Sequence, residues 1–223
     1  PRTYRFRQPF GLPVRYHDIK VFSKVSNLDL VEIHLSYKDL EVDLDQVLPE
    51  RQEIGLVVHA PELFAGDHTL DLCTADEGYR DHSVRELQRV IDISRDLRGR
   101  FRCPAPVLLV TNVGGFSEHR HLDRDERKPL QQRLIESLGR LNCGGDVEII
   151  PQTMPPFPWH FGGQRFHNLF VDPGFIHSFC EQQGMRVCLD VSHSKLACNH
   201  LHLPFRDFLN QILPFTAHLH LAD

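Results

Sequence analysis

The chain has 223 residues, 41% hydrophobic and 25% charged, a composition that suits one globular domain with a sizeable core. Its 25 lysine and arginine residues are outnumbered by 30 aspartate and glutamate residues and are scattered, which argues against a nucleic-acid-binding protein. No apolar run reaches the length of a membrane span, and residues 1–7 lack the apolar core of a secretion signal. We therefore expect a soluble, cytoplasmic protein without a membrane partner.

The cysteines and histidines indicate whether the chain carries disulfides or metal ligands. Six cysteines stand singly, with no C-x-x-C pair, so reduced thiols are expected rather than three disulfides. The 15 histidines are unusual, because histidine titrates near neutral pH and is the commonest metal ligand. Their places along the chain are the main guide to function.

The first 24 residues, with Pro9, Gly11 and Pro13, are expected to form a linker or an arm that covers a sheet edge. One domain then extends over residues 25–223. It contains six apolar runs that are continuous rather than alternating, which is typical of strands buried on both faces. In chain order, the predicted strands are 30–35, 54–58, 106–110, 147–150, 186–189 and 215–221.

Amphipathic stretches between the predicted strands indicate helices over residues 83–97, 128–142, 172–184 and 204–213. The first is expected to begin at a capping box formed by Ser83 and Glu86. Asp172 followed by a proline predicts the start of the third, and Gly184 its end.

Strands that alternate with helices predict βαβ units and a parallel sheet. A doubly wound open sheet and a barrel both satisfy this pattern, but no G-x-G-x-x-G or phosphate-binding loop supports the nucleotide-binding open sheets. We favour an α/β fold of the (β/α)8 TIM-barrel type. Such barrels typically need about 250 residues, so with six recognisable strands the barrel is expected to be incomplete by two βα units.

Polar side chains follow every predicted strand, where α/β enzymes carry their reactive groups. In strand order they are His34, His59, Asn112, Gln152, then Asp190 with His193, and finally His218, His220 and Asp223. The pair Asp190 and His193 is the most informative, because both side chains could turn toward one ion or one substrate. With His220 and the amide of Gln152 they form a mixed nitrogen and oxygen ligand set that suits Mn²⁺, Zn²⁺, Co²⁺ or Mg²⁺.

The loop 154–168 follows the fourth predicted strand and combines prolines and glycines with Trp159 and Arg165. The indole could stack on a sugar, and the guanidinium could hold a phosphate or carboxylate group. A stiff cover over the barrel mouth explains the same composition.

The motifs LVVHAPE, CLDVSH and HLHLAD resemble those of the xylose isomerase-like TIM barrels, a family of sugar isomerases, sugar epimerases and endonuclease IV-type repair enzymes. The resemblance covers residues 29–223. It implies a divalent metal held by Gln152, Asp190 and His220, with His193 facing the substrate or a second metal and His59 lining the pocket. His34 and Asn112 join the expected substrate-binding residues.

Two departures from the family bear on catalysis. Gln152 stands where the family has a glutamate, and an amide can ligate a metal through oxygen but cannot act as a general base. The family's last acidic ligand comes from an eighth strand that is not recognised here. In the isomerases and epimerases these two carboxylates transfer the proton through an enediolate, so the sequence alone leaves open whether this chain is an enzyme.

Three functions therefore compete. The first is a metal-dependent isomerase or epimerase acting on a sugar or sugar phosphate. The second is a non-catalytic sugar-binding or scaffolding barrel, fused to or partnered with a sialic acid synthase-type enzyme, which the sequences FGLPVRYHD and PQTMPPFPW resemble. The third, an endonuclease IV-like phosphodiesterase, is disfavoured because Asn112 replaces a metal-binding histidine of that branch. A homo-oligomer is compatible with all three.

Overall fold

The computed structural model describes residues 7–19, 21–22, 27–103, 106–157 and 165–221. A five-stranded parallel sheet runs in the order β1-β2-β3-β6-β8, and β10 and β11 form a second parallel pair. A parallel bridge between Gln152 and Cys188 links the end of β8 to β10. The seven strands are β1 (Gly11–Val14), β2 (Leu30–His34), β3 (Gly55–His59), β6 (Val107–Thr111), β8 (Val147–Pro151), β10 (Val187–Asp190) and β11 (Thr216–His220).

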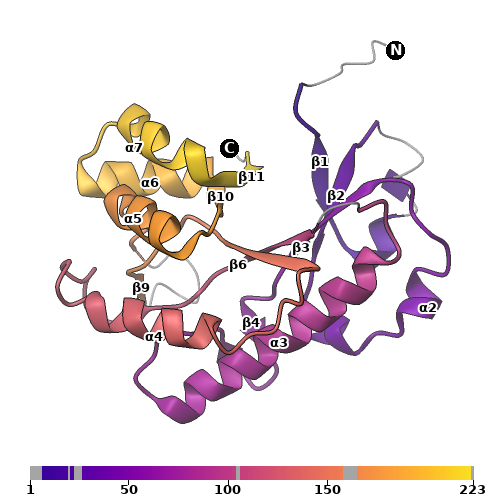
Figure 1. Ribbon diagram of the computed structural model, residues 1–223, viewed down its shortest axis with the longest axis horizontal. Coiled ribbons are helices and arrows are strands. Elements are labelled where there is room, and N and C mark those ends of the chain that lie inside the picture. The colour runs from indigo at the N-terminus through magenta and orange to yellow at the C-terminus, as the bar shows by residue number, and fades with distance from the viewer. Residues whose placement is uncertain (1–6, 20, 23–26, 104–105, 158–164, 222–223) are drawn as a thin grey trace.

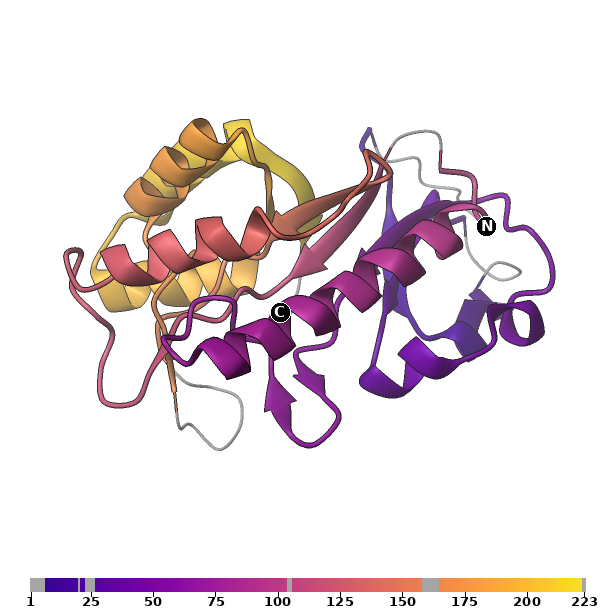
Figure 2. The ribbon, with the colours of Figure 1, turned by 60° about the horizontal axis from the view of Figure 1, so that its bottom comes forward.

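These seven strands follow one another in chain order, as in a TIM barrel and unlike a doubly wound sheet. The helices are α2 (Leu44–Val47), α3 (Glu77–Arg98), α4 (Lys128–Leu138), α5 (Pro173–Gln183), α6 (Val191–Leu201) and α7 (Phe205–Ile212), with 3-10 turns η1 (Tyr16–Asp18), η2 (Tyr37–Glu41) and η3 (Leu213–Phe215). Two short hairpins pair β4 (Leu63–Phe64) with β5 (His68–Thr69) and β7 (Phe116–Ser117) with β9 (Phe166–His167). Figures 1 and 2 show α3 and α4 crossing the outer face of the strands, with α5, α6 and α7 beside β10 and β11.

The two faces of the sheet differ because side chains alternate along a strand. Val31 and Ile33 of β2 point outward into the main core, which also contains the buried stripe of α3. Val57, Val110 and Ile150 point inward and form a smaller apolar layer. Polar side chains share this inner face toward the carboxyl ends of the strands, where they surround the barrel interior.

All six predicted strands are present, but the sequence missed a seventh. Gly11–Val14 forms β1 and pairs in parallel with β2, so the expected linker or edge-covering arm over residues 1–24 contains an edge strand of the sheet. Its Pro13 is tolerated because an edge strand can leave one side without ladder hydrogen bonds. Among the described residues the barrel is therefore one strand short of eight, and not two as predicted.

The helix predictions were mostly confirmed. Asp172 caps α5, and Gly184 ends it with a φ of 63°. The predicted start of α3 was wrong, because Asp76 accepts a hydrogen bond from the Tyr79 amide and starts the helix earlier. Ser83 lies buried inside α3, where its hydroxyl accepts a hydrogen bond from the Asp71 amide. All six cysteines are free, as expected.

Candidate metal centre

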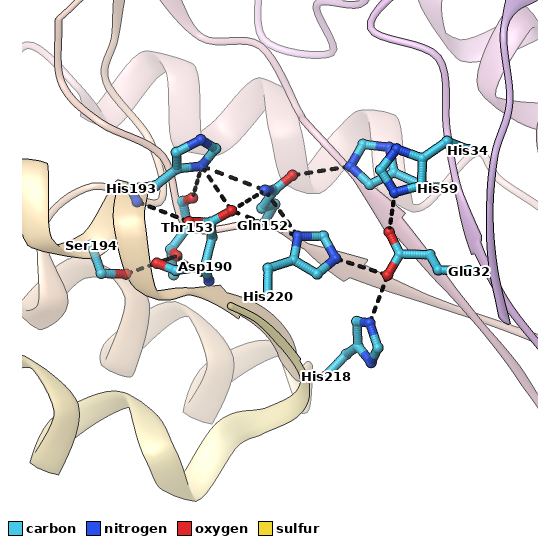
Figure 3. A network of polar contacts seen from close by, with 10 residues as sticks. All are labelled: Glu32, His34, His59, Gln152, Thr153, Asp190, His193, Ser194, His218 and His220. Carbon is cyan, nitrogen blue, oxygen red and sulfur yellow. Dashed lines mark hydrogen bonds and ion pairs between the residues drawn. The ribbon is translucent and has the colours of Figure 1, made fainter. Parts of the chain in front are cut away.

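Ten polar side chains form one network on the inner face, at the carboxyl ends of the strands (Figure 3). Gln152, Asp190 and His193, supported by Thr153 and Ser194, make up what we call the oxygen-rich half. Glu32, His34 and His218 make up the histidine-rich half. His59 and His220 touch both halves.

The histidine-rich half is built around Glu32, which is only 5% exposed. Its Oε2 lies 2.7 Å from Nε2 of His218 and 2.8 Å from Nε2 of His220. Its Oε1 lies 2.7 Å from Nε2 of His34. Burial alone would raise the pKa of Glu32, but the imidazole contacts outweigh it and hold that pKa well below its usual range. Glu32 is therefore a buried carboxylate at neutral pH.

The oxygen-rich half is fixed by the start of α6. Asp190 is the N-cap, and its Oδ1 accepts a hydrogen bond of 2.8 Å from the amide of His193. This leaves Oδ2 facing Gln152, whose Nε2 lies 3.0 Å away. The His193 ring donates from Nδ1 to the carbonyl of Thr153 at 3.0 Å. Burial raises the pKa of Asp190, but the contact with His220 and the bond from the His193 amide bring it below its ordinary value.

His220 lies between two carboxylates. Its Nε2 faces Glu32, while its Nδ1 lies 3.6 Å from Oδ2 of Asp190 and 3.3 Å from Nε2 of Gln152. Burial opposes the charged ring, but contacts with Asp190, Cys188 and Glu32 raise the pKa of His220 to about 12. The network thus holds a positive charge at this point, and in the absence of a metal that charge is a proton.

The protonation of His59 determines which end of the Gln152 amide can face a cation. Burial lowers the pKa of His59, so its ring is neutral and carries one N–H. That N–H is on Nδ1, because Nδ1 lies 2.9 Å from the carbonyl oxygen of Ala60, which can only accept. Nε2 of His59, 3.1 Å from the amide oxygen of Gln152, then accepts best from the NH₂ group. When the Gln152 amide is rotated by half a turn, its NH₂ group donates to His59 and its oxygen faces the carboxylate of Asp190. Two oxygens that face each other in this way are stabilised by a cation between them.

A profile of the xylose isomerase-like TIM barrel family matches residues 23–223. The chain belongs to this family. Solved structures agree in fold. A D-tagatose 3-epimerase-like protein is 16% identical with a TM-score of 0.59, over 95% of this chain and 76% of that one. A D-psicose 3-epimerase solved with D-fructose is 12% identical with a TM-score of 0.60, over 96% and 72%.

Endonuclease IV from Thermus thermophilus is 15% identical with a TM-score of 0.57, over 97% of this chain and 77% of that one. At such identities the likeness shows the fold alone. A search of curated proteins gives no significant match. No helix among the described residues is long and apolar enough to cross a membrane.

The structure brings most of the residues predicted from the family motifs into the network. Gln152, Asp190, His193, His220 and His59 meet there, and His34 joins them by stacking on His59 with ring centres 4.5 Å apart. Whether any of them binds metal or substrate stays a prediction.

Two other predicted residues lie outside the network, and a third is not among the described residues. Asn112 is buried, and its Oδ1 accepts from the amide of Gly114, which has a φ of 79° that favours glycine, so this side chain holds a turn. The Arg165 guanidinium lies 5.7 Å from the centre of the Phe116 ring. Trp159 lies outside the described residues.

The sequence analysis missed Glu32 and gave His218 no specific role. Glu32 stands two residues before His34, and residues two apart in a strand share a face. A lone acid inside the apolar run LVEIHL was the available signal.

Proposed function

We propose that the chain is a metal-dependent isomerase or epimerase of a sugar or sugar phosphate. The observation that carries this proposal is the convergence of Asp190 Oδ2, His220 Nδ1 and the Gln152 amide, 3.0 to 3.6 Å apart, on adjacent strands of the family barrel. A divalent metal would be held by those two ligand atoms and by the amide oxygen. When bound, it would polarise a substrate carbonyl and acidify the neighbouring C–H group.

The chain's own groups must then move the proton. Gln152 cannot accept one. His59 stays neutral because burial lowers its pKa, so its Nε2 is the basic atom beside the cation position. It would take the proton and return it once a bound substrate displaces the contact with the Gln152 NH₂ group. A single base serves an isomerisation, in which the proton leaves and returns on one face of the substrate. Isomerisation is therefore the better-supported reaction of the two.

The test is proton exchange followed by NMR in D₂O. The chain is incubated with Mn²⁺ and, in turn, ketoses, aldoses and their phosphates. We expect deuterium at the carbon beside the carbonyl, lost in Asp190→Asn and His59→Gln and retained in His202→Asn, which replaces an exposed histidine that ends α6.

One specific observation favours a second function. Gln152 replaces the carboxylate that the family resemblance implies, and a barrel that only binds a sugar needs no such base. Saturation-transfer NMR on the same sugars distinguishes the two functions. Binding without deuterium exchange would favour the sugar-binding barrel and contradict the isomerase, whereas neither binding nor exchange would contradict both.

A further inference from the structure

His220 offers a metal two different sides, and the isomerase proposal uses only one of them. Nδ1 faces the oxygen-rich half, while Nε2 faces Glu32 and His218. On the Nε2 side, one oxygen or nitrogen atom from each of Glu32, His218 and His220 lies within 4.8 Å of the other two. We propose that Glu32, His218 and His220 form a second metal position that is selective for Zn²⁺.

The distances suit a small tetrahedral ion. The Oε2 of Glu32 lies 2.7 Å and 2.8 Å from the two ring nitrogens. Ligand atoms about 2.0 to 2.1 Å from a tetrahedral zinc stand roughly 3.3 Å apart. Small side-chain rotations that move these atoms about half an ångström apart would therefore let one zinc ion take the place of the two protons that Glu32 shares with the imidazoles.

The surroundings hold these ligands in place. Nε2 of His34 contacts the other carboxylate oxygen of Glu32 at 2.7 Å, so Oε2 is kept directed at the two rings. Oδ2 of Asp190 lies 3.6 Å from Nδ1 of His220 and favours the proton on that nitrogen, which leaves the Nε2 lone pair for a metal. The side chains of His218 and His220 are 16% and 17% exposed, so an ion can reach the position from solvent.

Ligand chemistry separates the two positions. Two imidazoles and one carboxylate suit zinc, whereas the carboxylate and amide oxygens of the other side suit manganese or magnesium. A neutral His220 ring has one lone pair, so the two positions exclude each other. The metal supplied, rather than the protein alone, decides which side of the ring is used. The mutual exclusion of the two metal positions rests on the proposed function, whereas the zinc position itself does not.

The test is calorimetric titration of the metal-free chain with Zn²⁺ and, separately, with Mn²⁺. His218→Asn and Glu32→Gln remove ligands of the zinc position. Asp190→Asn weakens the manganese position but keeps an oxygen that can accept from Nδ1 of His220 and cap α6. His202→Asn is the matched control for a histidine substitution.

We expect one Zn²⁺ per wild-type chain. Zinc affinity should fall by more than roughly 100-fold in both His218→Asn and Glu32→Gln, because each removes a ligand. In Asp190→Asn it should fall by at most about 10-fold, because the amide oxygen can still accept from Nδ1 of His220. Manganese should show the reverse order for His218→Asn and Asp190→Asn. Zinc retained in His218→Asn, or lost equally in Asp190→Asn, would overturn the proposal, as would no zinc binding by the wild type. Failure of the deuterium exchange assay alone would leave it standing.

Discussion

The two halves of the network reach the same place by different local structures. In the oxygen-rich half, Asp190 is fixed by capping a helix, so its carboxylate has one oxygen committed to the backbone and one free. In the histidine-rich half, Glu32 is fixed only by side chains, with imidazoles on both oxygens. The oxygen-rich half is therefore held by the backbone of α6, whereas the histidine-rich half is held by the attraction between the Glu32 carboxylate and the imidazoles around it. Substitutions should therefore affect the two halves in different ways.

The largest effect should come from Asp190→Ala. It removes the N-cap of α6, and it leaves Nδ1 of His220 and Nε2 of Gln152 without the buried carboxylate that they face. We expect a loss of about 3 to 5 kcal/mol in the free energy of unfolding, because breaking a buried ion pair adds to the loss of the cap. Urea unfolding measures it. Asp76→Ala, which removes only the cap of α3, should cost about 1 kcal/mol, and equal losses in the two variants would contradict this assignment.

Glu32→Gln should cost about 2 to 3 kcal/mol at neutral pH, because it leaves a cationic His220 beside an uncharged amide. The pKa of Glu32 is depressed, so its contribution is present above the unfolded value near 4.5 and is lost as the pH falls. The pKa of His220 is raised from 6.5 to about 12, so its contribution is full below 6.5 and is lost as the pH rises toward 12. The difference between wild type and variant should therefore be greatest from about pH 4.5 to 6.5.

Unfolding curves measured from pH 4 to 9 check this window. Imidazole NMR provides a second measurement, in which the pKa of His220 should fall in Glu32→Gln. A pH-independent difference in stability, or an unchanged His220, would show that the carboxylate is not the partner that holds the charge.

The same contrast explains what the sequence could predict. Asp190 and His193 belong to one short motif, and with Gln152 they were named from the sequence, whereas Thr153 and Ser194 of the same half were not. The histidine-rich half required counting back from His34 along β2, because its carboxylate precedes the end of the strand. Glu32 contacts His218 and His220, which follow it in the chain by 186 and 188 positions. No local pattern predicts such a pairing.

The errors in the fold have equally local causes. Gly11 and Pro13 lower β-propensity, yet at the edge of a sheet they cost little, so β1 was interpreted as part of a linker or an edge-covering arm and not as a strand. The helix α6 was missed because it begins at the residue that follows β10, with Asp190 as both the last strand residue and the cap. An abrupt junction of this kind leaves no loop residues to mark a boundary.

The smallest predicted effect tests whether the oxygen-rich half depends on more than its charges. The hydroxyls of Thr153 and Ser194 lie 2.9 Å apart, and the Thr153 hydroxyl accepts from the Asp190 amide. Ser194→Ala removes one fully buried hydrogen bond and should cost about 1 kcal/mol in urea unfolding. Because the Asp190 amide keeps its acceptor, manganese affinity should stay within about threefold. A tenfold loss of affinity would mean that the cap of α6 does not position Asp190 by itself, and that the half predicted from the motif relies on hydroxyl contacts the motif does not specify.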